Sequence, residues 1–157
     1  GVEEIVVVGG RKNRLEYADQ VGATRTINYH EAREDITQVI LKVRKDGFPN
    51  VIEASGSARA MEVGLQAAAR RGHILALSDY GMETANFRWN HLLWGEWEII
   101  GSNASAGAWE EAVRLAASRE IALDGLISRS YPVAEWKQAF EMVRSRETGM
   151  IKVVFTW

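Results

Sequence analysis

The chain opens with a short strand that ends on two glycines. The run Glu4–Val8 is rich in β-branched residues, Gly9 and Gly10 follow it, and a helical pattern begins shortly afterwards. This order is typical of a buried parallel strand and the turn into its helix, and ligands bind at such carboxyl ends in open α/β sheets. Only residues 1–3 precede the strand, and they contain no Gly-x-Gly-x-x-Gly motif. We therefore expect any phosphate-binding turn of this fold to lie outside the chain, which we interpret as a fragment.

Strand and helix patterns alternate along most of the sequence. The predicted strands are Glu4–Val8, Thr26–Tyr29, Asn50–Ala54 and His73–Leu77. The predicted helices between them are Lys12–Val21, a helix from Ile36 that ends near Gly47, and Met61–Ala68. Beyond these we predict short strands at Trp89–Trp94 and Glu96–Gly101, helices near residues 109–116 and 136–143, and a last strand at Ile151–Phe155. Alternation of this kind predicts an α/β fold with a doubly wound parallel sheet.

Composition excludes several classes of protein. The 157 residues are 46% hydrophobic and 25% charged, which is ordinary for a globular domain with a core. The formal charge of −2 provides no general attraction for nucleic acid or anionic lipid. There is no cysteine, which excludes disulfides and thiolate ligands, and no apolar run approaches the roughly 18 residues of a membrane span. We expect a cytoplasmic protein without nucleic-acid or membrane partners.

The turn after the first strand has two interpretations. Gly9 and Gly10 could simply permit a tight turn, with Arg11, Lys12 and Arg14 as a solvated helix start. Alternatively, the basic side chains face a bound phosphate. Dinucleotide folds that prefer NAD place Asp or Glu after this strand to bind the ribose 2′-hydroxyl, whereas Arg accommodates the 2′-phosphate of NADP. No acidic residue stands here, and Gly9 leaves room for the phosphate.

Neither a metal site nor a catalytic nucleophile is predicted. None of His30, His73 and His91 has a second histidine or a carboxylate at a ligand spacing. We interpret them as solvated or packing side chains. Ser55 lacks the flanking glycines of a hydrolase nucleophile elbow.

The order of several short motifs resembles the medium-chain dehydrogenase/reductase family, and most of all its zinc-type alcohol, polyol and threonine dehydrogenases. The resemblance covers essentially all 157 residues but only the C-terminal part of a family member. It implies a Rossmann-like sheet that lacks its first strand and glycine-rich turn, followed by a C-terminal remnant of the catalytic domain. The motifs are Gly9-Gly10-Arg11, Leu15-Glu16-Tyr17-Ala18, Gly22-Ala23-Thr24, Ile27-Asn28-Tyr29, Val51-Ile52-Glu53-Ala54-Ser55-Gly56, Ile99-Ile100-Gly101-Ser102 and Ile151-Lys152-Val153-Val154.

The resemblance also implies a role for individual residues, all of them in cofactor binding. Gly9, Gly10, Arg11 and Tyr29 match the 2′-phosphate site of NADP-dependent relatives, and Arg14 matches a basic residue near the adenosine ribose. Ala54 and Ser55 match the strand end that lines the adenine side, and Lys152 matches a basic residue that reaches the pyrophosphate. The segments that hold the nicotinamide amide are matched by Leu77, Ser78, Gly101, Ser102 and Asn103. NADP is therefore expected in preference to NAD.

The implied function is the coenzyme-binding portion of an NADP-preferring zinc-type alcohol or polyol dehydrogenase, inactive alone. Residues 1–125 would form a partial dinucleotide-binding domain and residues 126–157 a segment packing with the absent catalytic domain. Zinc and most of the pocket for the alcohol or carbonyl substrate are expected only in that absent part. A homodimer is expected through an edge strand at Leu92, Leu93 and Trp94.

Two alternatives stay open. The first is a zinc-free quinone or enoyl reductase of the same superfamily, because the residues that separate the two groups lie mostly in the absent part. The second is a non-catalytic nucleotide-binding or assembly module. In the strand order 3-2-1-4-5-6 the absent first strand is central, so its loss leaves two neighbours with unpaired backbone groups for another chain to fill.

Overall fold

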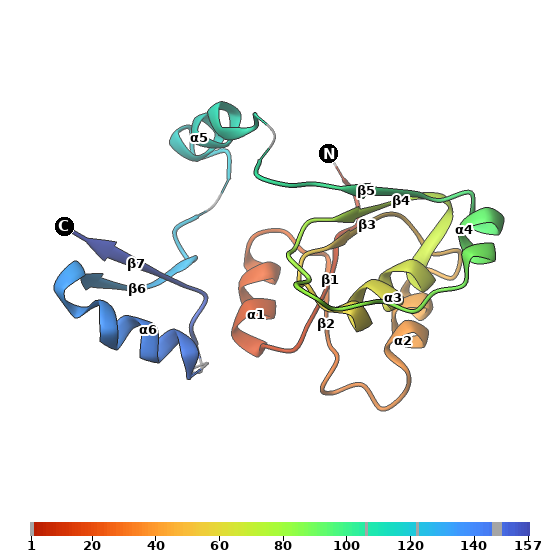
Figure 1. Cartoon of the computed structure of the whole chain (residues 1–157), viewed down its shortest axis with the longest axis horizontal. Helices are drawn as coiled ribbons and strands as arrows, with labels where there is room; N and C mark the ends of the chain where they lie inside the picture. The colour runs from red at the N-terminus through yellow and green to blue at the C-terminus, as the bar shows by residue number, and fades with distance from the viewer. Residues whose placement is uncertain (1, 106, 122, 146–148) are drawn as a thin grey trace. The chain divides into compact units, whose positions relative to one another are not determined.

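Parallel strands and helices build two compact units of this chain. The structure is a computed structural model that describes residues 2–105, 107–121, 123–145 and 149–157. The first unit combines Gly1–Glu31 with Trp109–Trp157, and the second is Ala32–Ala108. Figure 1 labels the helices and strands of both.

The first unit begins with the predicted strand, helix and strand. They are β1 (Val6–Gly9), α1 (Lys12–Gln20) and β2 (Arg25–Asn28), and β1 and β2 pair in parallel. Gly22 follows α1 with a φ of +114°, which suits a residue without a side chain. The helix packs against both strands, and its Leu15 is buried, as is Ile27 of β2. The predicted apolar face of α1 therefore forms a small core with the strands.

The C-terminal part of the first unit contains a strand that the sequence analysis did not predict. This part comprises α5 (Trp109–Ala117), β6 (Ile127–Pro132), the 3₁₀ turn η1 (Val133–Glu135), α6 (Trp136–Arg144) and β7 (Lys152–Thr156). Strand β6 is mostly polar, so its sequence lacks the apolar signal of a strand. It forms through parallel pairing with β7, while α6 packs over the pair.

The second unit is a three-stranded parallel sheet with helices packed on it. Its elements are α2 (Ile36–Val43), β3 (Phe48–Glu53), α3 (Ala58–Ala67), β4 (Ala68–Ala76), α4 (Trp89–Gly95) and β5 (Glu98–Gly101). The strand order is β3-β4-β5 (Figure 1), and α3 packs against β3 and β4. Ile74 on the central strand is fully buried. The predicted alternation of strands and helices is confirmed in this unit as far as β4.

The predicted strand at Trp89–Trp94 is wrong, because these residues form helix α4. A short apolar run does not distinguish a strand from a helix by periodicity alone. The helix places His91 and Trp94 one turn apart, with ring centroids 6.1 Å from each other. It ends at Glu96, whose φ of +51° breaks the helical path, and the N–H groups of Glu96 and Trp97 close the end on carbonyls of the last turn.

Consequently Leu92, Leu93 and Trp94 are not an edge strand. The edge strands of this sheet are β3 and β5, and each pairs with the central strand β4. Leu93 and Trp94 are exposed on α4, at 71% and 66%. The predicted contact residues therefore remain on the surface, but in a helical segment.

Every described strand except β4 has one edge without a strand partner among the described residues. They include β1, which pairs with β2 in the first unit, and β3, which pairs with β4 in the second. All strand pairs in both units are parallel, as expected for a Rossmann-type fold. Of the helices in the described part of the chain, none is both long and apolar enough to cross a membrane.

Candidate cofactor-binding site

The predicted residues of the first unit meet at the carboxyl end of β1 and β2. Gly9 is the last residue of β1 and pairs with Asn28, and the N–H of Tyr29 donates to the Gly9 carbonyl at 3.1 Å. Because the two strands are parallel, the Gly9–Gly10 turn and Tyr29 leave the sheet at the same edge. The structure thus brings together residues that lie 20 positions apart in the sequence.

Gly10 lies directly beneath two aromatic rings. A Cβ placed on Gly10 would overlap the Tyr29 ring and would lie 2.8 Å from Nε2 of His30. The Tyr29 and His30 ring centroids are 4.4 Å apart. A glycine is therefore required here for the rings to rest on the turn.

His30 lies at this site but was not among the predicted site residues. The three histidines are scattered in the sequence, and His30 has no ligand spacing with another residue. The structural signal is its position next to Tyr29, at the end of a strand parallel to β1. The imidazole is a polar group beside the turn that could face a bound phosphate.

Two arginines give this edge its positive charge. Arg11 is the N-cap residue of α1, and its side chain makes no capping hydrogen bond. Arg14, one turn into the helix, donates to the Ile151 carbonyl at 3.4 Å, next to Lys152 at the start of β7. Burial, and then the charge of Arg11, lower the pKa of Arg14, although an arginine stays protonated at neutral pH. The cations at this helix start could be stabilised by an anionic ligand.

The predicted residues of the second unit also gather at one sheet edge. Glu53 pairs with Ala76, and Ala76 pairs with Gly101, so β3, β4 and β5 end at the same level. The Leu77 N–H donates to the Glu53 carbonyl at 3.0 Å, and the Ser102 N–H donates to the Ala76 carbonyl at 3.1 Å. Of the predicted residues of this unit, Gly101 lies at this level as the last residue of β5. The others follow the strand ends directly, and they are Ala54, Ser55, Leu77, Ser78, Ser102 and Asn103.

This edge of the second unit is open to ligands. The Leu77 side chain is 51% exposed, and a Cβ placed on Gly101 would meet no described atom within 4 Å. Backbone groups and an exposed apolar side chain at the ends of parallel strands suit a flat, polar-edged ring. The edge is therefore accessible to a ligand, and the role of these residues in holding a nicotinamide amide stays a prediction.

A buried carboxylate lies behind these turns and was not among the predicted site residues. Glu53, at 5% exposure, accepts hydrogen bonds from the Ser55 N–H, the Ser55 hydroxyl, the Gly56 N–H and the Tyr80 hydroxyl. Burial raises the pKa of Glu53, but these donors outweigh it, so the net shift is downward. The carboxylate is ionised at neutral pH and organises the turn after β3.

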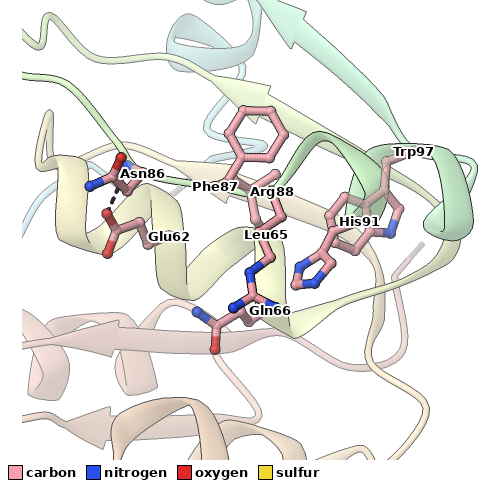
Figure 2. Close-up of a pocket in the computed structure, with 8 residues that line it drawn as sticks. All are labelled: Glu62, Leu65, Gln66, Asn86, Phe87, Arg88, His91 and Trp97. Atoms are coloured by element: carbon pink, nitrogen blue, oxygen red, sulfur yellow. Dashed lines mark hydrogen bonds between the residues drawn. The ribbon is translucent and has the colours of Figure 1, made fainter.

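A pocket of the second unit involves none of the predicted site residues. Its volume is about 390 Å³, and Figure 2 shows it between α3, the segment before α4 and Trp97. The Asn86 N–H donates to Glu62 at 2.9 Å on one side. The lining residues are Glu62, Leu65, Gln66, Asn86, Phe87, Arg88, His91 and Trp97. The candidate cofactor residues of this unit thus lie at the carboxyl ends of its strands and not in this pocket.

The described residues do not offer a site for a zinc ion. Among them, no group of three or more His, Asp or Glu side chains is arranged to hold a metal.

Comparisons with known proteins identify the family to which the chain is similar. A family model described as zinc-binding dehydrogenase matches residues 1–118. Sorbitol dehydrogenase from Halalkalibacterium halodurans is 26% identical over 96% of the chain and 44% of its own length. L-threonine 3-dehydrogenase from Pyrococcus horikoshii is 31% identical over 99% of the chain and 44% of its own length. The chain thus spans less than half the length of these curated relatives.

Solved structures share the fold. Benzyl alcohol dehydrogenase from Acinetobacter calcoaceticus has a TM-score of 0.81 and 28% identity, over 98% of this chain and 43% of that one. A putative zinc-binding dehydrogenase from Sinorhizobium meliloti, bound to NADP, has a TM-score of 0.83 and 22% identity, over 99% and 46%. An alcohol dehydrogenase from Escherichia coli CFT073, complexed with NADH, has a TM-score of 0.88 and 17% identity, over 99% and 45%.

The family match covers most of the chain, and the sheet edges carry the residues that the family resemblance singled out. The predicted resemblance and the Rossmann-type α/β fold are confirmed. The chain belongs to the zinc-binding dehydrogenases of the medium-chain dehydrogenase/reductase family.

Proposed function

We propose that this chain is the coenzyme-binding portion of an NADP-preferring dehydrogenase that interconverts an alcohol or polyol with its ketone or aldehyde. Its curated relatives are named sorbitol and L-threonine dehydrogenases, which supports this class of substrate. The nicotinamide supplies the chemistry by accepting or donating a hydride. This chain binds and orients the cofactor and does not turn over substrate by itself.

The preference for NADP rests on the turn after β1. The Gly9–Gly10 turn lies under Tyr29, Arg11 follows it, and no carboxylate stands there to bind a ribose 2′-hydroxyl. A 2′-phosphate would accept a charge-assisted hydrogen bond from the Arg11 guanidinium. Arg14 and Lys152 add positive charge to the same unit. Solved relatives carry either NADP or NADH, so the turn itself is the basis of the proposal.

Two further parts of the cofactor are proposed to contact the second unit. The nicotinamide amide would be held by backbone groups of Leu77, Ser78 and Gly101–Asn103. The adenine side would be lined by Ala54 and Ser55. The common level of β3, β4 and β5 supports this assignment, because it sets those turns side by side.

We also propose that the intact protein is a homodimer that uses Leu92, Leu93 and Trp94. The exposure of Leu93 and Trp94 on α4 supports this, since water contact with two large apolar side chains is unfavourable. Sedimentation of wild type and a Leu93→Glu variant would test it. The variant should sediment as a monomer at concentrations where the wild type is a dimer.

The first experiment is a calorimetric titration of the chain with 2′,5′-ADP and, separately, with AMP. These ligands differ by the 2′-phosphate, so their affinity ratio measures its contribution. A charged hydrogen bond contributes roughly 1.5–3 kcal/mol, which corresponds to about ten- to a hundredfold tighter binding of 2′,5′-ADP. Arg11→Ala should remove most of that ratio and leave AMP binding unchanged.

Lys12→Ala is the matched control. Lys12 is the next basic residue along the chain, and its side chain is 82% exposed and 3.8 Å from Glu16. Its removal should change the ratio by less than about twofold, because an exposed ion pair contributes little. Equal affinities for the two ligands, or full discrimination by the Arg11→Ala variant, would contradict the NADP assignment.

A further inference from the structure

Two neighbouring turns of the second unit share one buried carboxylate. From the turn after β3, Glu53 receives the Ser55 N–H at 2.8 Å, the Ser55 hydroxyl at 2.5 Å and the Gly56 N–H at 3.2 Å. From the segment after β4 it receives the hydroxyl of Tyr80, which lies 27 positions away. Donors from both sides thus converge on a side chain that is 5% exposed. A buried carboxylate that lost a donor would be costly, so each turn helps to hold the other.

The backbones of the same two turns are in contact. Gly56 has a φ of +72°, and a Cβ placed on it would overlap the carbonyl oxygen of Asp79. The Leu77 N–H donates to the Glu53 carbonyl at 3.0 Å, at the base of both turns. The segment of residues 77–80 is therefore fixed to the turn of residues 53–56 at three levels, namely the strand ends, the backbone contact and the carboxylate.

We infer that Glu53 and Tyr80 form a clamp that fixes the turn after β4 to the turn after β3, so that Leu77 and Ser78 are in position to receive the nicotinamide-bearing half of a dinucleotide. The inference rests on the cofactor role proposed above. The clamp residues are positioning residues, since Glu53 lies behind the turns while Leu77 and Ser78 line the open edge. Holding the turns in place before binding removes the ordering cost that the ligand would otherwise meet.

The protonation states suit this clamp. Hydrogen bonds keep Glu53 ionised despite its burial. Burial, the hydrogen bond to Glu53 and the carboxylate charge together raise the pKa of Tyr80 well above its ordinary value. At neutral pH the phenol therefore keeps its proton and donates a hydrogen bond to an ionised carboxylate. Such a charge-assisted hydrogen bond is stronger than one between neutral groups.

The test compares Tyr80→Phe and Glu53→Gln with wild type by residue-resolved amide hydrogen exchange. Loss of a charge-assisted hydrogen bond should speed exchange at Ser55, Gly56 and Leu77 by about ten- to a hundredfold. Tyr131→Phe is the control, because it removes a tyrosine hydroxyl that donates to Met142 in the first unit. In Tyr131→Phe, the amide exchange rates of Ser55, Gly56 and Leu77 should equal those of wild type. Unchanged exchange in both clamp variants would overturn the inference.

A second readout separates positioning from general stability. NADP and 2′,5′-ADP are titrated into wild type and Tyr80→Phe. The variant should bind NADP about tenfold more weakly, because the turn that carries Leu77 and Ser78 loses its anchor. It should bind 2′,5′-ADP within twofold of wild type, because this ligand lacks the nicotinamide half and Glu53 keeps its hydrogen bonds to Ser55 and Gly56 in the turn proposed to line the adenine. Equal losses for both ligands, or no loss of NADP affinity, would overturn the positioning role. Wild type that fails to bind 2′,5′-ADP would instead refute the proposed cofactor role, and the exchange result would still decide whether the clamp exists.

Discussion

Replacing Gly56 with alanine should destabilise the second unit far more than the same change at Gly81. Both glycines have positive φ, +72° and +55°, where an alanine costs about 1–2 kcal/mol. A Cβ at Gly81 would meet no described atom within 4 Å, so only this conformational cost applies to Gly81→Ala. At Gly56 the Cβ would overlap the Asp79 carbonyl oxygen and lie 3.4 Å from the Ser78 Cβ. Relieving that overlap moves backbone, which costs a further ~1–3 kcal/mol.

The assay is urea unfolding at neutral pH, followed by circular dichroism and by tryptophan fluorescence. We expect the free energy of unfolding to fall by about 2–5 kcal/mol for Gly56→Ala and about 1–2 kcal/mol for Gly81→Ala. The difference between the variants isolates the contact with Asp79, because the conformational cost is common to both. Losses that agree within about 0.5 kcal/mol would refute the reasoning, since the close approach of the two turns would then carry no energy.

Three further outcomes can be checked with the same preparations. Ile74→Ala should lower the free energy of unfolding by about 2–5 kcal/mol in urea, because Ile74 is fully buried between its neighbours on β3 and β5. Because the folded-state pKa of Glu53 is below its unfolded value, its contribution is present above about pH 4.3 and is lost as the pH falls through the folded pKa. The urea midpoints of wild type and Glu53→Gln should therefore differ most near neutral pH and converge in acid; a gap that widens in acid would contradict the sign. Gly10→Ala should weaken calorimetric binding of 2′,5′-ADP by displacing the Tyr29 ring, with little change in the urea midpoint because Tyr29 is half exposed.

Several elements could be predicted because their signal is local. The β-branched run ending at Gly9 forms β1, and apolar residues at helical spacing from Ile36 form α2, which ends at Val43 rather than near Gly47 as predicted. In both cases the period of the apolar side chains selects the element, and a glycine or polar residue ends it. The Gly9-Gly10-Arg11 turn could be singled out for the same reason, since the strand, the turn and the helix start are contiguous.

Other elements depend on partners that are distant in the sequence. The segment at Trp89–Trp94 has an apolar pattern that fits either element, and in the folded unit it packs on β4 as a helix. Strand β6 has too few apolar residues to be predicted and forms because β7 offers parallel backbone partners. In both cases the local pattern is ambiguous and packing decides.

The sequence by itself determined the family, the alternation of strands and helices, and the turn at Gly9, because these follow from contiguous residues and their spacing. Only the tertiary structure decided that Tyr29 and His30 rest on Gly10, and that Tyr80 donates to Glu53 across 27 positions. Parallel strands end at one edge whatever the length of chain between them, so side chains that are remote in sequence meet there. A hydrogen bond depends on that final proximity, which no local pattern encodes.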